Sequence, residues 1–148
     1  MKIIIDADSC PVKENAVAIA GEYDIHVLMI ASVSHNIAEE AGVSIRIVDS
    51  LPQEADIAII NSAKKGDIVI TNDQGLASIV LKKYTGVISP DGYIFREKDI
   101  DHLLEIRELQ RRLREKGIRT KGPKKRKKEQ DMTFEKNLRN LIDEMISA

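Results

Sequence analysis

Short apolar runs alternate with stretches of helical periodicity along the first ninety residues of the chain. The runs are rich in β-branched residues, and the first, Ile3–Ile5, is apolar at every position, as in a central strand of a parallel sheet. The predicted strands are 3–6, 24–31, 44–48, 68–71 and 86–89, and the predicted helices between them are 11–21, 36–41, 52–66 and 76–84. This alternation predicts a three-layer α/β fold with a mainly parallel sheet.

Local sequence signals predict where two of the helices begin and where one of them ends. Ser9 or Cys10 is its expected cap and Pro11 lies in its first turn, because proline is favoured there. Pro52 similarly opens a later helix that Gly66 ends.

The pattern changes after a turn predicted at Pro90-Asp91-Gly92. Residues 98–116 predict one long charged helix, residues 117–130 a loop, and residues 133–146 a final helix. We therefore divide the chain into an α/β domain over 1–96 and a C-terminal helical extension over 97–148. The extension is expected to pack on the same domain, although the pattern also allows packing on a second subunit and hence a homo-oligomer.

Composition narrows the classes of function. The 148 residues contain 43% hydrophobic and only 3% aromatic residues, which argues against nucleic-acid binding on a broad aromatic stacking platform. Cys10 is the only cysteine, so neither an internal disulfide nor a cysteine-rich zinc site is expected. Neither a secretion signal nor a membrane span is visible. We therefore expect a cytoplasmic protein without a membrane partner.

The formal net charge of −1 hides a strong asymmetry. Between Arg111 and Lys128 the chain has eleven Lys or Arg residues and a single acid, Glu115. A dense basic segment beside an acidic body predicts a nucleic-acid partner, although a solvated linker would have the same composition. The expected nucleic-acid-binding residues are Arg107, Arg111, Arg112, Lys121, Lys124, Lys125, Arg126, Lys127 and Lys128.

Acidic residues gather where the predicted strands end. Asp6 and Asp8 follow the first strand, Asp49 the third and Asp73 the fourth. In extended backbone, Asp6 and Asp8 would point to the same side. Ligands of open parallel sheets bind at this edge, and clustered carboxylates suit Mg²⁺ or Mn²⁺. Each acid also has an ordinary structural role available, such as helix capping by Asp8 or Asp73.

Several sequence blocks carry a family resemblance that covers almost the whole chain. They are Asp6-Ala7-Asp8-Ser9-Cys10-Pro11, Ala55-Asp56, Gly66-Asp67-Ile68-Val69-Ile70-Thr71-Asn72-Asp73, Ser89-Pro90-Asp91-Gly92 and Gly122-Pro123. With these blocks the chain resembles the YaiI/YqxD family of bacterial proteins, which is considered similar to PIN-like nuclease domains. The resemblance implies a PIN-like topology and places the roles of the nuclease acids on Asp6, Asp56 and Asp73, with Asp8 as an extra acid. PIN nucleases usually have a further Glu on an earlier helix, for which Glu39 and Glu40 are the candidates.

The sequence thus predicts metal-dependent hydrolysis of a phosphodiester, with RNA as the expected substrate. Asp6, Asp8, Asp56 and Asp73 would hold Mg²⁺ or Mn²⁺, and such ions activate water and stabilise the leaving oxygen. Ser9 and Asn72 would position substrate or water molecules around the metal.

Two alternatives belong to other classes. A non-catalytic RNA-binding or ribosome-associated module could use the basic segment and hold a structural metal ion. The opening Asp6-Ala7-Asp8 also resembles that of haloacid-dehalogenase-type phosphatases. That site needs a later acid after a strand, whereas Asp67 precedes its strand, so we do not expect the phosphatase site to assemble.

Overall fold

Five parallel strands form one sheet in the computed structural model, which describes residues 1–32, 40–51, 53–117 and 126–148. The strands are β1 (Lys2–Asp6), β2 (His26–Ala31), β3 (Val43–Ile47), β4 (Ile68–Ile70) and β5 (Gly86–Ile88). Their order across the sheet is β3-β2-β1-β4-β5, with β1 at the centre. Residues 3 to 5 of β1 pair with β2 on one side and with β4 on the other.

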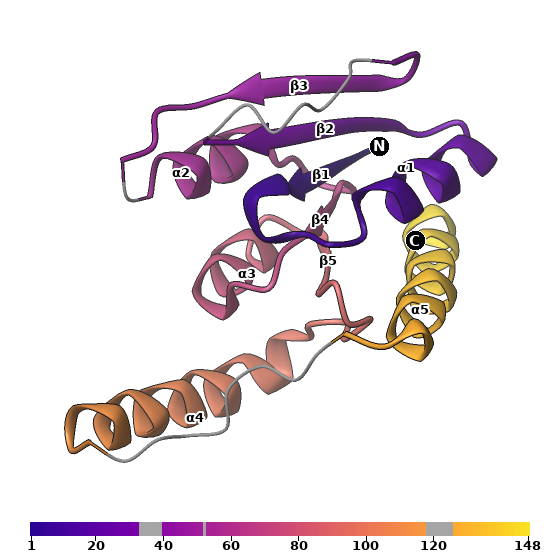
Figure 1. Ribbon diagram of the computed structural model, residues 1–148. Coiled ribbons are helices and arrows are strands. Elements are labelled where there is room, and N and C mark those ends of the chain that lie inside the picture. Colours follow the sequence, from indigo (N-terminus) through magenta and orange to yellow (C-terminus); the bar gives the residue numbers. More distant parts are fainter. Residues whose placement is uncertain (33–39, 52, 118–125) are drawn as a thin grey trace.

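Helices cover both faces of this sheet (Figure 1). They are α1 (Lys13–Glu22), α2 (Glu54–Ser62), α3 (Gln74–Leu81), α4 (Glu97–Glu115) and α5 (Lys128–Ser147), with a short 3-10 helix, η1 (Ala7–Ser9), after β1. One face packs against α1 and α5, and the other packs against α2, α3 and the start of α4. The predicted three-layer α/β fold with a parallel sheet and a C-terminal helical extension is confirmed.

Apolar side chains of β1 divide between the two cores. Ile3 and Ile5 lie in the core beneath α1 and α5, while Ile4 lies in the core beneath α2 and α3. All three are fully buried, because a central strand covered on both faces has no solvent side.

Two predicted element boundaries near the start of the chain are wrong. The first helix begins at Lys13 and not at Pro11, because Lys13 Nζ donates to the carbonyl oxygens of Ala7 and Cys10 and closes a separate turn first. Neither Ser9 nor Cys10 is therefore its cap. The strand predicted from Asp24 begins at His26, since Asp24 adopts a left-handed conformation with φ of 56°.

The loop predicted over 117–130 is too long, because α5 already begins at Lys128. The helix predicted over 52–66 covers only Glu54–Ser62, since Ala63 is extended. Its predicted start at Pro52, and most of the helix predicted over 36–41, lie outside the described residues.

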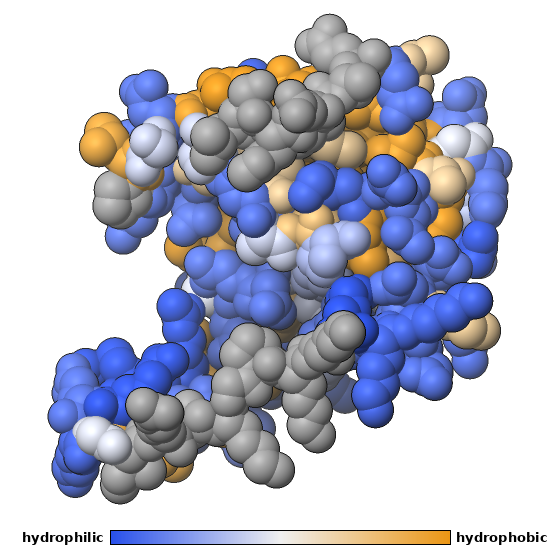
Figure 2. All heavy atoms as spheres, viewed as in Figure 1, coloured by the Kyte–Doolittle hydropathy of each residue, from blue (hydrophilic) through white to orange (hydrophobic). Residues whose placement is uncertain are grey.

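The two helices of the extension are placed differently. From α5, the fully buried Phe134 and Leu138 enter the same core as Ile3 and Ile5. By contrast, α4 has one buried residue, Ile100, near its start, and then projects away from the sheet (Figure 1). Hydrophilic residues cover most of α4 in Figure 2. No helix in the described part of the chain is long and apolar enough to cross a membrane.

Candidate functional site

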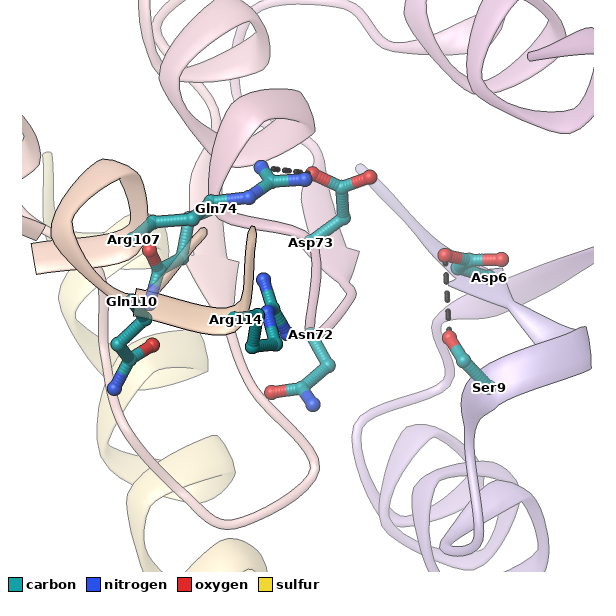
Figure 3. Close-up of a pocket in the computed structure, with 8 residues that line it drawn as sticks. All are labelled: Asp6, Ser9, Asn72, Asp73, Gln74, Arg107, Gln110 and Arg114. Carbon is teal, nitrogen blue, oxygen red and sulfur yellow. Dashed lines mark hydrogen bonds and ion pairs between the residues drawn. The ribbon is translucent and has the colours of Figure 1, made fainter. Parts of the chain in front are cut away.

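A cleft opens at the carboxyl edge of the sheet, beside β1 and β4. From β1 the chain runs to β2 and β3 on one side, and it then returns to β4 and β5 on the other. Ligands of doubly wound sheets bind at such a switch point. The cleft has a volume of about 640 Å³. Its lining residues are Asp6, Ser9, Asn72, Asp73, Gln74, Arg107, Gln110 and Arg114 (Figure 3).

Asp6 is the last residue of β1 and is only 9% exposed. Its Oδ2 accepts hydrogen bonds from Thr71 Oγ1 at 3.1 Å and from Ser9 Oγ at 3.3 Å. The Thr71 hydroxyl oxygen in turn accepts a bond from the Asp73 backbone N–H at 3.1 Å. Thr71 is fully buried, so it ties the ends of β1 and β4 together and fixes the two acids relative to each other.

The electrostatics of Asp6 show that other acids lie near it. Burial raises the pKa of the Asp6 carboxyl, while the hydrogen bonds from Thr71 and Ser9 oppose the rise. The negative charges of Asp56 and Asp8 raise this pKa further. A cation at this position would relieve the repulsion among these groups.

Asp73 caps α3 and faces the cleft. Its Oδ1 accepts a hydrogen bond from the Leu76 backbone N–H at 3.1 Å, so the capping role open to Asp73 from the sequence is confirmed. The same oxygen forms an ion pair with Arg107 Nη1 at 3.5 Å (Figure 3).

Asp56 and Asp8 flank the cleft without lining it. Asp56 is in the first turn of α2, and burial followed by the charge of Asp73 raises its pKa. Asp8 lies in η1, where its Oδ2 accepts bonds from the backbone N–H and the hydroxyl of Ser32 at 2.9 and 2.6 Å. The expectation of extended backbone from Asp6 to Asp8 is therefore wrong, because the chain turns immediately after β1.

The oxygen ligands available here suit a hydrated Mg²⁺ or Mn²⁺ ion. Among the described residues, no three Asp, Glu, His or Cys side chains form a ready-made metal cluster. Mg²⁺ commonly uses one or two carboxylates and completes its shell with water and substrate phosphate oxygens. Asp6 and Asp73 in one cleft fit that requirement.

Other acids singled out from the sequence lie elsewhere. The carbonyl of Glu40 accepts a bond from Val43 at the start of β3, which places Glu40 at the edge opposite the cleft. Glu39 lies outside the described residues. Asp67 precedes β4 and forms an ion pair with Lys2 at 2.6 Å, so it cannot complete a phosphatase site with Asp6.

The basic residues predicted to bind nucleic acid fall into separate groups. Arg107 lines the cleft, whereas Arg111 and Arg112 form ion pairs with Glu108 on their own helix. Lys127 lies at the N-cap position of α5, and Lys128 is the first residue of that helix. The remaining three lysines, Lys121, Lys124 and Lys125, lie outside the described part.

Arg126 is held against the body of the protein. Its guanidinium forms ion pairs with Asp131 at 2.5 Å and with Asp91 at 2.9 Å, and it donates to the carbonyl oxygen of Pro90 at 2.7 Å. It borders a smaller cleft of about 330 Å³ that shares Ser9 and Asn72 with the first.

Sequence reasoning missed four residues of the site: Thr71, Gln74, Gln110 and Arg114. Thr71 is the one polar residue that ends an otherwise apolar run, which signals a buried hydrogen bond. Gln110 and Arg114 follow Arg107 at three and seven positions, a spacing that places all three on one helix face. The Gln74 Oε1 is buried and has no hydrogen-bond partner within the described ranges.

Comparison with known proteins gives a consistent result. Residues 4–144 match the family model described as "Uncharacterized BCR, YaiI/YqxD family". A UPF0178 protein of Alkaliphilus metalliredigens is 41% identical over 143 residues, covering 97% of this chain and 92% of the relative. One from Natranaerobius thermophilus is 40% identical over 149 residues and the full length of both. One from Clostridium tetani is 40% identical, covering 96% of this chain and 97% of its own. No solved structure gives a significant match.

Proposed function

This chain belongs to the YaiI/YqxD family, and we propose that it is a nuclease that hydrolyses phosphodiester bonds in RNA with a bound Mg²⁺ or Mn²⁺ ion. The observation that carries the proposal is the link from Asp6 through Thr71 to Asp73 at the switch point of the sheet. It holds two carboxylates in one cleft at the edge where doubly wound sheets bind their ligands.

Each acid has a distinct part in this proposal. Asp6 and Asp73 hold the cation from the ends of β1 and β4, while Asp56 and Asp8 add negative charge beside Asp6. Asp6 stays oriented because Thr71 and Ser9 both donate to one oxygen. When bound, the cation polarises the phosphodiester and activates water for attack.

Other side chains of the cleft suit a polyanionic substrate. Asn72 presents an exposed amide beside Asp73, and Arg107 and Arg114 bring positive charge to the opposite wall. These groups would orient the phosphate relative to the two acids, and orientation of this kind contributes several kcal/mol to catalysis.

Cleavage of a labelled RNA in Mn²⁺ tests the proposal directly. The substitutions Asp6→Asn and Asp73→Asn each remove one charge from the cleft, and Asn still caps α3 at position 73. Both should abolish cleavage. Asp24→Asn is the matched control, because Asp24 is exposed at the far edge of the sheet and Asn tolerates its left-handed backbone.

A second measurement separates binding of the metal from catalysis. Mn²⁺ should raise the melting temperature of the wild type and of Asp24→Asn, and should raise that of Asp73→Asn less. Equal shifts in all three proteins would remove Asp73 from the site. A normal Mn²⁺ shift without any RNA cleavage would favour the non-catalytic RNA-binding module with a structural metal.

A further inference from the structure

One face of α4 forms the wall of the cleft opposite the acids. We propose that Arg107, Gln110 and Arg114 bind phosphates along the backbone of the substrate, and that Arg107 exchanges Asp73 for a phosphate when the cation binds. This inference rests on the proposed function for the identity of its ligand, a single-stranded RNA backbone.

The geometry of α4 supports a continuous binding face. Arg107, Gln110 and Arg114 are three and seven positions apart, so their side chains follow one another along the same side of the helix. All three line the cleft that also contains Asp6 and Asp73 (Figure 3). Helix residues therefore supply hydrogen-bond donors, and strand ends supply carboxylates, across one shared space.

The contact between Arg107 and Asp73 is suited to exchange. The two atoms are 3.5 Å apart, and the side chains are 55% and 34% exposed. Ion pairs with this exposure are weak. A divalent cation on Asp73 would repel the guanidinium, which can then donate to a phosphate oxygen in the same cleft.

Gly75 makes room for this arrangement. A Cβ at Gly75 would lie 3.2 Å from Arg107 Nη1 and 3.2 Å from Asp73 Oδ1. The missing side chain thus lets the guanidinium approach the first turn of α3 closely.

Neighbouring arginines on α4 differ in their partners. Arg111 pairs with Glu108 and Glu115, and Arg112 pairs with Glu108 and borders a separate hollow with Leu109. Across the described residues, the Arg114 side chain forms no hydrogen bond or ion pair, although it lines the cleft. The arginine that lacks an acidic partner is thus one that faces the proposed ligand.

The test compares Arg107→Gln and Arg114→Gln with Lys98→Gln as the matched control, because Lys98 is an exposed cation on the same helix that does not line the cleft. Binding of a labelled single-stranded RNA is measured by fluorescence anisotropy in EDTA at several salt concentrations. We expect Arg114→Gln to weaken binding on the order of tenfold and to lower the slope of log affinity against log salt by about 0.7. Arg107→Gln should have a smaller effect on both quantities, because Arg107 stays paired with Asp73 when no cation is present. Lys98→Gln should change neither quantity.

A second measurement is the affinity for Mn²⁺ alone, determined by titration calorimetry without RNA. Here the substitution at Arg107 should strengthen binding, whereas it should weaken the binding of RNA. Arg107→Gln should bind Mn²⁺ more tightly, on the order of threefold, because Asp73 then has no competing cation. Arg114→Gln should leave Mn²⁺ affinity close to that of the wild type. Weaker Mn²⁺ binding by Arg107→Gln would overturn the exchange of partners.

A loss of RNA affinity in Lys98→Gln equal to that in Arg114→Gln would overturn the assignment of one face of α4, because the total charge of the helix would then be sufficient to explain binding. A failure of the proposed function alone would give a different result. The cleft variants would still show the expected loss of RNA affinity, but the wild type would not cleave RNA in Mn²⁺. The two outcomes are separable because RNA binding is measured in EDTA.

Discussion

At the scale of single residues, Asp6 is an acid whose ionised form is disfavoured by its place in the fold. It ends a fully buried strand, and burial raises its pKa in the folded protein. The neighbouring charges of Asp56 and Asp8 act in the same direction. A group of this kind is kept at the expense of stability, as is common at binding sites.

This shift predicts a pH dependence of stability. Between the ordinary value of 3.8 and its raised value, the folded protein holds the Asp6 proton more tightly than the unfolded chain does. The free energy of unfolding of the wild type should therefore fall as the pH rises through that window. Asp6→Asn lacks this contribution and should gain stability relative to the wild type. Urea unfolding in EDTA at pH 4 to 7 measures the difference, and a difference that does not change with pH would contradict the prediction.

At the scale of elements, the turn after β5 is the point where α5 docks. Gly92 in this turn has φ of +89°, and its carbonyl accepts a bond from Asn137 Nδ2 at 2.7 Å. A Cβ at Gly92 would lie 3.0 Å from the backbone nitrogen of Phe134. The turn and the helix therefore approach more closely than any other residue would permit.

Alanine at Gly92 should be strongly destabilising. Gly66→Ala is the control, because Gly66 has the same φ of +89° and nothing within 4 Å of its Cβ position. We expect Gly66→Ala to cost about 1–2 kcal/mol from backbone strain alone. Gly92→Ala should cost about 1–3 kcal/mol more, since backbone atoms of α5 must move. Chemical denaturation measures both, and equal losses would show that the close approach is unimportant.

The elements that could be predicted from the sequence are those defined by burial. All five strands lie within two residues of their predicted bounds, because runs of buried β-branched residues have few other solutions. The ends of the helices were harder to predict from the sequence. The start of α1 depends on the contacts of Lys13 with two carbonyl groups that local propensity does not reveal.

The same distinction applies to the site. Asp6 and Asp73 were predictable because Asp6 ends one buried strand and Asp73 closely follows the strand beside it. Arg114 and Gln110 were not, since α4 carries charged residues on several faces and its own sequence does not fix which face meets the cleft. That choice depends on Ile100, which anchors α4 in the core near α3.

At the scale of the whole molecule, the basic residues after α4 do not all have the same role. Arg126 is one of five consecutive basic residues, yet it bonds to Asp131, Asp91 and Pro90. It therefore joins the start of α5 to the turn after β5. We expect the lysines around it to supply the contacts to phosphate.

This division predicts the effect of a four-residue replacement that leaves Arg126 in place. Replacing the four lysines next to Arg126 with serine should weaken the binding of RNAs of unrelated sequence to a similar extent, because contacts to phosphates do not distinguish the bases. If two or three of them touch phosphate, the slope of log affinity against log salt should fall by roughly 1.4–2.1 on single strands. The replaced residues are Lys124, Lys125, Lys127 and Lys128.

Serine at Lys64 and Lys65 is the control for this measurement. Both are exposed and consecutive, and they precede β4 at the edge opposite the cleft. Their replacement should leave the slope unchanged. An unchanged slope in the four-serine variant as well would identify the basic run as a solubilising linker.

The arginine spacing on α4 also sets a length scale for the substrate. Seven residues separate Arg107 from Arg114, and at about 1.5 Å per residue their backbones are about 10 Å apart along the helix. Successive phosphates on one strand of a DNA duplex advance about 3.4 Å along the axis, and on that scale the interval corresponds to about three nucleotides. Affinity should therefore rise steeply as an oligonucleotide grows to about four nucleotides and more slowly beyond, which makes α4 a molecular ruler for the shortest strand that can engage both arginines.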